Sequence, residues 1–436
     1  MDREILRLAV PALGALVAEP LFLLADSAMV GHLGAEPLAG LGIASAVLQT
    51  IIGLMIFLAY STTPAVARQL GAGNTRAAVS TGISSSWLAL AIGVVLAIAG
   101  WATAPWLAGL FGATAEVAEH ASAYLAISMF GLPAMLLVFA ASGLLRGLQD
   151  TRTPLLVAGI GFAANIVLNF LFMYGLGLGF VGSAIGTVVA QWGMALSYAV
   201  VIATHARRVG APLFAYRVGI RGTIGSGGWL LLRTASLRAA ILLAVLVATR
   251  MGSNELAAFQ VVMTIFATLA FALDALAIAA QALVGLGLGA ADVLTVRAIL
   301  TRCLQWGIGS GVAMGAIVAV LSPIAGAAFT NDAAVAGMLP LALVIIGVGA
   351  PLSGYVFVLD GVLIGAGDMR YLALTGITNV AAFVPLAAAV WLWAPTGVAG
   401  LAWLVAAFAI GYIGARAVTL GLRARGSRWM VTGSIR

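Results

Sequence analysis

The first long apolar stretch of the chain, residues 9–32, carries two carboxylates, Glu19 and Asp26. An ionisable side chain inside a membrane-spanning helix is costly, so such groups usually face a protein interior or an aqueous path and have a function there. Seven residues of helix leave the two acids about 20° apart on one face and roughly 10.5 Å apart along the axis. Pro20 lies between them and is expected to bend the helix. We predict that these acids couple an ion or bind substrate; the alternative is that each pairs with a polar neighbour.

A second group of polar side chains lies in the fifth and sixth apolar stretches. Asn165 and Asn169 stand four residues apart and share one helix face, as do Thr187 and Gln191. Counted from the outer ends of their stretches, Asp26, Asn169 and Thr187 lie at the same depth, about 9 Å inside. If the stretches pack together, these side chains form an oxygen-lined pocket suited to a hard monovalent cation or a proton relay. The alternative is ordinary hydrogen bonding between helices, which Asn and Thr often supply in membrane bundles.

Further polar side chains inside apolar stretches are candidates for lining a substrate cleft. They are Gln49, Tyr60 and Gln191 in the first half of the chain and Asp274 in the second half. Asp274 lies in mid-span with no polar neighbour in sequence. We weigh a position lining the cleft equally against one away from it.

Two other acids of the second half have simpler explanations. Glu255 begins a span and can cap a helix N-terminus, which the helix dipole favours. Asp360 lies near the inner end of its span and can belong with Asp368 and Arg370 at the neighbouring inner loop. The sequence therefore points less strongly to a function for these two acids than for Asp26, and it leaves their role open.

Composition places the chain in the membrane. Of 436 residues, 63% are apolar, 8% are charged and 54 are glycine, far from the composition of a soluble domain. Twelve apolar stretches are long enough to cross about 30 Å of hydrocarbon, which predicts an all-α integral membrane protein. They fall near residues 9–32, 37–69, 77–104, 115–145, 154–175, 181–205, 223–250, 254–288, 293–321, 334–364, 371–394 and 397–421.

Several classes of protein are disfavoured by the same sequence. The single Cys303 excludes an internal disulfide, and no Cys/His cluster has metal-ligand spacing, so we expect no cofactor besides a coupling ion. The first stretch lacks the pattern of a cleaved signal peptide and is expected to be retained as a span. The net charge of +7 comes from arginines scattered between apolar stretches, which predicts no nucleic-acid partner.

The arginines orient the chain, because short cytoplasmic loops collect positive charge. With both termini inside, 20 of the 21 basic residues, all of them arginine, fall on or near the cytoplasmic side. The exception is Arg250. We predict cytoplasmic termini and the plasma membrane of a bacterium or archaeon.

The chain repeats itself at a nearly constant offset, so that the segment from Gly143 recurs from Gly361. GLLRGLQDTR recurs as GVLIGAGDMR, and VARQLGAGN recurs as VGLGLGAAD. Two halves with an even number of spans must share one orientation, so we expect lobes related by a pseudo-two-fold axis along the membrane normal. The predicted domains are 1–205, a cytoplasmic linker at 206–222, and 223–436.

The repeat does not preserve the polar residues: the position equivalent to Asp26 holds Ala244, and the position equivalent to Asn165 holds Phe383.

The chain resembles the multidrug and toxic compound extrusion (MATE) family, specifically its DinF-type branch. The resemblance is carried by DSAMVGHLG from Asp26, by the twin GLLRGLQD and GVLIGAGD loops and by the NIVLN stretch. The resemblance covers essentially the whole chain. It implies export of bulky, often cationic organic compounds, driven by sodium or proton entry, with Asp26 as the coupling acid and Thr187 matching the family's sixth-helix hydroxyl.

One position departs from the family pattern. The family's fifth-helix pair reads Asn, three residues, Asp, whereas this sequence has Asn165 and then Asn169. A sodium site wants several oxygens and usually more than one fixed negative charge, while one carboxylate is enough for a proton. We therefore expect proton coupling, with sodium as the alternative. In the NorM-type branch the second lobe carries the acids, and Glu255 and Asp360 match those only loosely.

Other functions are weighed against this one. A lipid-linked precursor flippase of the same superfamily is expected to line its cleft with arginines, and here nearly all arginines sit at the ends of the apolar stretches. A membrane enzyme such as a polyprenyl transferase needs clustered acids, and an ATP-driven pump needs a GxxxxGK[ST] loop; neither is present in the sequence. We expect a monomeric antiporter, not an enzyme, whose partners are a small organic substrate and the lipid bilayer.

Overall fold

The structure is a computed structural model that describes residues 1–214, 217–330 and 332–433. The side chains of residues 19, 22, 217–224, 226 and 327 lie outside this description. Every helix and turn of the described residues fits an all-helical protein, and within them twelve helical segments are long and apolar enough to cross a membrane. This confirms the predicted fold class.

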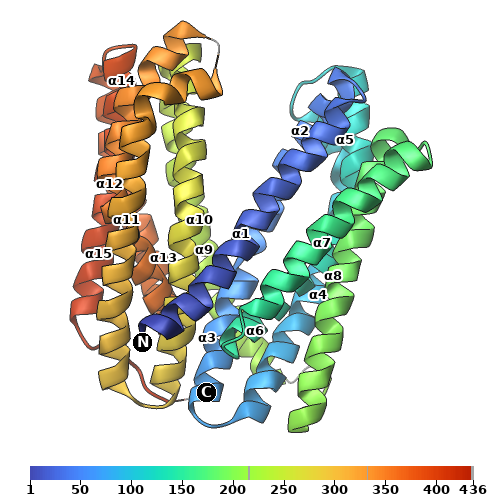
Figure 1. The fold of residues 1–436 in the computed structure, drawn as a ribbon, viewed down its shortest axis with the longest axis vertical. Helices are drawn as coiled ribbons and strands as arrows, with labels where there is room; N and C mark the ends of the chain where they lie inside the picture. The colour runs from blue at the N-terminus through green and yellow to red at the C-terminus, as the bar shows by residue number, and fades with distance from the viewer. Residues whose placement is uncertain (215–216, 331, 434–436) are drawn as a thin grey trace. The chain divides into compact units, whose positions relative to one another are not determined.

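The described chain divides into two compact units (Figure 1). Residues 10–227 form the N-terminal unit, and residues 1–9 with 228–433 form the C-terminal unit. Two helices, α1 and α9, therefore contribute to both units. In the predicted linker at 206–222, α8 continues to Val209 and α9 begins at Arg217, while residues 215 and 216 lie outside the described part.

Ten helical elements lie wholly or mostly in the described part of the N-terminal unit. They are α1 (Asp2–Gly31), α2 (Ala35–Met55), α3 (Phe57–Gly71), α4 (Thr75–Gly109), α5 (Ala115–Ser128), η1 (Met129–Gly131), α6 (Leu132–Gly147), α7 (Arg152–Phe170), η2 (Leu171–Gly175) and α8 (Gly179–Val209). Pairs such as α2 and α3 together make one span.

Eight elements lie wholly or mostly in the described part of the C-terminal unit. They are α9 (Arg217–Met251), α10 (Ser253–Gly289), α11 (Val293–Phe329), α12 (Ala333–Gly365), α13 (Met369–Trp393), α14 (Val398–Ala406), η3 (Ala407–Tyr412) and α15 (Ile413–Arg425). Figure 1 shows α11 and α12 side by side, in agreement with their extensive contact.

The internal repeat is visible in equivalent helix caps. Asn74 accepts a hydrogen bond from Ala77 N at 2.9 Å at the start of α4, and its repeat-mate Asp292 accepts one from Thr295 N at 3.0 Å at the start of α11. Each cap satisfies a backbone donor that a helix start leaves without a partner. Both halves of the sequence thus begin the equivalent helix with a side-chain N-cap.

Glycine sets the close approach of α7 and α8, which run side by side in the N-terminal unit (Figure 1). A Cβ at Gly186 would overlap with Asn169 Oδ1, and one at Gly182 would lie 2.7 Å from Met173 N. Small residues one turn apart let two membrane helices come together this closely. The same contact holds Asn169 in place. Immediately after α7 the chain passes into the π-helical turn η2, a feature frequent near functional sites.

Candidate functional site

Asp26 of α1 is buried, at 3% exposure, and accepts hydrogen bonds from three neutral side chains. Ser183 Oγ donates to Asp26 Oδ1 at 2.6 Å, Asn169 Nδ2 donates to the same oxygen at 2.9 Å, and the Tyr124 hydroxyl donates to Oδ2 at 3.2 Å. Among the described residues, no arginine forms an ion pair with this acid. When it is ionised, a buried carboxylate with neutral donors alone carries a negative charge that a proton or another cation can balance.

Four helices converge on this carboxylate. α1 carries it, α5 supplies Tyr124, α7 supplies Asn169 and α8 supplies Ser183. Phe180 and His120 fix the region around the tyrosine, since the Tyr124 and Phe180 rings lie 5.2 Å apart and Phe180 also contacts the His120 ring at 5.4 Å. The donors are therefore held by packing of their helices, and the site is preorganised around Asp26.

Beside Asp26 lies a cavity that is partly open to solvent. Its polar lining includes Asp26, Gln49, Asn165, Thr187 and Gln191. Its apolar lining comes from leucine, isoleucine, methionine and phenylalanine side chains of the surrounding helices. A mostly apolar cavity with a few converging polar groups is the usual form of a small-molecule site.

Several oxygen atoms around this cavity are buried with no hydrogen-bond partner in the described part of the chain. They are Ser128 Oγ, Asn165 Oδ1, Asn169 Oδ1, Thr187 Oγ1 and Gln191 Oε1. Native proteins rarely leave such atoms unsatisfied, because each costs about 1–3 kcal/mol. A concentration of them beside one carboxylate fits a site for a hard cation or for water that carries a proton.

The polar residues predicted for the N-terminal unit are thus largely brought together. Asn169 contacts Asp26 directly, while Asn165, Thr187, Gln49 and Gln191 line the same cavity. Tyr60 is half-buried in α3 and does not line it. The Glu19 side chain lies outside the described part, and its backbone belongs to α1.

The acids of the C-terminal unit have other surroundings. Asp274 is half-buried in α10. Glu255 Oε1 accepts a hydrogen bond from Gly397 N at 2.7 Å, at the residue before α14. Glu255 therefore contacts the start of a different helix from its own, where the sequence indicated a cap on its own helix.

The predicted grouping of Asp360 with Asp368 and Arg370 is wrong. Asp360 lies inside α12 and pairs with Arg233 and Arg416, whereas Asp368 lies in the following loop and pairs with Arg423 at 2.6 Å. Asp368 follows Asp360 by eight residues and lies beyond the end of α12 at Gly365, so the two acids lie at different depths. Arg233 and Arg416 are exceptions to the expectation that nearly all arginines sit at the ends of the apolar stretches, because they are buried within their helices.

Sequence reasoning missed three of the site's side chains. Ser183 lies one helical turn before Thr187, so the face that Thr187 and Gln191 define already pointed to it. Tyr124 and Ser128 also stand four residues apart on one helix, but nothing in the sequence tells which face of that helix turns inward.

The repeat shows that the fold itself does not require these polar groups. The equivalent positions in the second half of the chain hold buried apolar side chains in the C-terminal unit. The pairs are Asp26 and Ala244, Asn165 and Phe383, Asn169 and Ala387, Ser183 and Leu401, and Thr187 and Val405. The polar site therefore serves something other than helix packing.

Comparison with known proteins agrees with this architecture. The MatE family model matches residues 11–171 and 237–396. Protein DETOXIFICATION 43 of Arabidopsis thaliana is 31% identical over 287 residues, which are 66% of this chain and 53% of that protein. DNA damage-inducible protein F of Escherichia coli (strain K12) is 28% identical over 296 residues, which are 67% of this chain and 64% of that protein. The chain thus spans between half and two thirds of these two relatives.

A solved structure described as MATE in the straight conformation shares the fold. The two structures superpose with a TM-score of 0.88 at 25% sequence identity, and the match covers 97% of this chain and 95% of the other chain.

Proposed function

This chain belongs to the MatE family, and we propose that it is an antiporter that exports organic compounds in exchange for a cation, with Asp26 as the coupling acid. One observation carries the proposal: a buried carboxylate without an ion-pair partner among the described residues borders a mostly apolar cavity that also exposes unpartnered oxygens. Such a carboxylate is neutralised only by a proton or a bound cation. Loading the ion therefore changes the charge of the cavity in which a substrate is held.

The hydrogen bonds of Asp26 supply the link to conformation. As a carboxylate it accepts from Asn169, Ser183 and Tyr124. Protonation removes the demand for some of these bonds and leaves α1, with Pro20 inside it, freer to move relative to α7 and α8. Ion loading then favours one arrangement of these helices, and substrate binding to the charged site favours another.

We propose the proton as the main coupling ion, because Asp26 is the one acid among the described side chains that lines the cavity. Sodium is the second candidate, favoured by the unpartnered oxygens of Asn165, Asn169 and Thr187. Both ions suit an oxygen-lined pocket. The number of fixed negative charges favours one ion over the other, because one carboxylate is enough for a proton whereas a sodium site usually has more than one.

The deciding experiment is export of ethidium, a fluorescent organic cation, by the full-length protein in proteoliposomes. An inward proton gradient at equal sodium should drive export, and an inward sodium gradient at equal pH should not. If sodium alone drives export and protons alone do not, the proton assignment fails. If the folded protein exports no ethidium under either gradient, coupled export of this class of compound is contradicted.

For the arrangement in the cell we propose a monomer in the plasma membrane of a bacterium or archaeon with both termini inside. The bias of the arginines supports the orientation of the termini. Phe214→Cys tests the orientation in a Cys303→Ala background, with Thr114→Cys as the matched control on the opposite side. An impermeant maleimide should label position 114 and not position 214 in intact cells. Labelling of position 214 from outside contradicts the orientation.

A further inference from the structure

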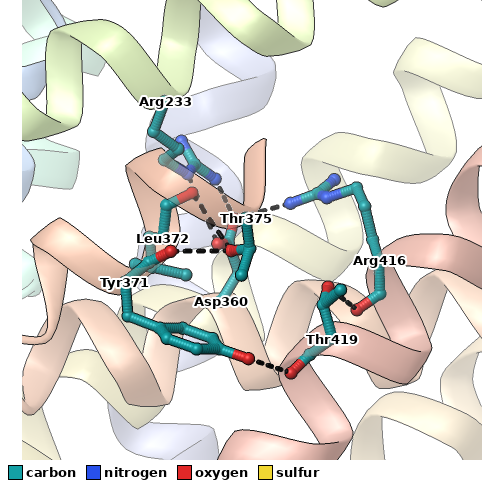
Figure 2. A network of polar contacts seen from close by, with 7 residues as sticks. All are labelled: Arg233, Asp360, Tyr371, Leu372, Thr375, Arg416 and Thr419. Carbon is teal, nitrogen blue, oxygen red and sulfur yellow. Dashed lines mark hydrogen bonds and ion pairs between the residues drawn. The ribbon is translucent and has the colours of Figure 1, made fainter. Parts of the chain in front are cut away.

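The C-terminal unit contains a buried group of three charges around Asp360 of α12. Arg233 of α9 donates to Asp360 through Nη2 to Oδ2 and through Nε to Oδ1, the latter at 3.3 Å. Arg416 of α15 donates through Nη2 to Oδ2 at 3.0 Å. Figure 2 shows the two guanidinium groups reaching the carboxylate from different sides. The side chains are 12%, 8% and 9% exposed for Arg233, Asp360 and Arg416.

Arg416 has donors to spare. A guanidinium carries five N–H donors, and in the described part of the chain Arg416 uses one of them, in its bond to Asp360. The rest of its planar fork matches the two oxygens of a carboxylate or phosphate. Asp360 occupies one edge of the fork and holds the group in place.

A second, independent feature stands one helical turn before Arg416. Tyr412, the last residue of η3, is 2% exposed, and its hydroxyl has no hydrogen-bond partner among the described residues. Tyr412 and Arg416 stand four residues apart, so their side chains share one helix face, and Tyr412 interacts electrostatically with both Arg416 and Arg233. Its ring is fixed by Phe408, which stacks on it at 5.6 Å, and by Phe383 at 5.5 Å. A rigid, unpartnered donor thus accompanies the arginine.

The helices that carry this group offer no second anion from their own sequence. α9, α13 and α15 contain no aspartate or glutamate, and Asp360 is the acid of α12. Asp360 accepts from both guanidinium groups, and burying Arg416 with most of its donors unused is costly unless something accepts from them. Another oxyanion placed between Arg416 and Tyr412 would do so and would also satisfy the tyrosine hydroxyl.

The repeat indicates that packing does not demand this group. The equivalent positions in the first half of the chain are Ala15, Ser142, Met194 and Tyr198 for Arg233, Asp360, Tyr412 and Arg416. Tyr412 ends the π-helical turn η3, four residues before Arg416 of α15, and such turns are frequent at functional sites. Conversely, the polar site around Asp26 has no counterpart here.

We propose that Arg416 and Tyr412, with Arg233 and Asp360 positioning them, form a binding site for a single oxyanion group, a carboxylate or a phosphate. The guanidinium edge of Arg416 binds two oxygens of the group and the Tyr412 hydroxyl donates to one of them. The oxyanion belongs either to a free organic or inorganic compound or to the headgroup of an anionic lipid. The site goes beyond the proposed cation coupling and stands independently of it, because it rests on residues of the C-terminal unit alone.

Binding by the purified full-length protein tests the site. Equilibrium dialysis in neutral detergent measures radiolabelled benzoate and inorganic phosphate, and nanodiscs of phosphatidylcholine with or without phosphatidylglycerol measure the lipid source. We expect saturable binding of at least one oxyanion. Competition of phosphatidylglycerol with benzoate or phosphate assigns the site to the lipid headgroup as well. No saturable binding of benzoate, phosphate or phosphatidylglycerol overturns the proposal.

Two tyrosine variants separate binding from structure. Tyr412→Phe removes a hydroxyl that has no partner in the described part of the protein, so the melting temperature should not fall, while affinity for the oxyanion should fall about tenfold or more. The matched control is Tyr371→Phe, which removes a hydroxyl that donates to Thr419 O at 2.7 Å in the same unit (Figure 2). That control should melt at a lower temperature and bind the oxyanion as the wild type does.

Charge variants complete the test. Arg416→Gln should abolish binding and Arg416→Lys should weaken it, and if Arg416→Gln does not fold, Tyr412→Phe decides. Unchanged affinity in a folded Tyr412→Phe or Arg416→Gln variant overturns the site. Asp26→Asn should bind the oxyanion normally, so failure of the coupling proposal and failure of this one are distinguishable.

Discussion

Replacing Asp26 by asparagine tests whether its charge, as opposed to its shape, is needed. Asn is nearly isosteric, and a carbonyl oxygen in the place of Oδ1 still accepts from Asn169 and Ser183. The Tyr124 hydroxyl, which now donates to Oδ2, can rotate to accept from the new amide. The change therefore preserves the hydrogen-bond network while it removes the negative charge.

The effect on stability follows from two opposing contributions. Hydrogen bonds to a charged group contribute about 1.5–3 kcal/mol each and neutral ones about 1 kcal/mol, so weakening three of them costs roughly 1.5–6 kcal/mol in total. Removing the charge also removes the cost of burying a carboxylate that pairs with no described cation, which is several kcal/mol. The two nearly cancel. We expect the melting temperature of Asp26→Asn to stay close to that of the wild type or to rise.

Transport should respond very differently. The asparagine side chain cannot take up a proton and carries no charge for sodium, so the charge of the cavity no longer changes with ion binding. Gradient-driven export of ethidium should therefore fall to the level of empty liposomes. The matched control is Asp292→Asn, the same substitution at the cap of α11, where asparagine caps equally well. The control should export normally. Full export by a folded Asp26→Asn variant would refute the coupling assignment.

Three further variants extend the argument. Gly186→Ala brings a Cβ into Asn169 Oδ1 and should destabilise by about 1–3 kcal/mol and reduce export, as measured by melting and by ethidium transport, whereas Gly193→Ala, with nothing within 4 Å, should do neither. Equal melting temperatures of the two variants would contradict the close contact. Asp360→Asn takes this anion away from two buried guanidiniums and should destabilise by about 3–5 kcal/mol in thermal or denaturant unfolding, and an unaffected variant would contradict the burial of this group. Asn169→Asp adds a second carboxylate beside Asp26 and should increase export driven by a sodium gradient at fixed pH; unchanged sodium dependence would speak against a cation site between these residues.

The sequence by itself determined the number and kind of the elements. In hydrocarbon the backbone must satisfy its hydrogen bonds within each segment, so length and hydropathy are enough to define twelve spanning helices. The rise of a helix is fixed as well, so depth can be counted along each span. That is why Asp26 and Asn169 were expected to meet, and they do. The repeat then singled out Asp26 and Asn165 as positions whose polarity the fold does not need.

Rotation of each helix about its axis was decided only by tertiary structure. Depth gives no information about which face of α5 turns inward, so Tyr124 and Ser128 remained indistinguishable from other polar residues. The sequence also does not predict partners that are far apart along the chain. It groups Asp360 with residues of the adjacent loop, whereas in the structure Asp360 pairs with arginines of α9 and α15. Which buried charges meet depends on how helices pack, because a charge pairs with whatever lies within about 4 Å of it and not with its neighbour along the chain.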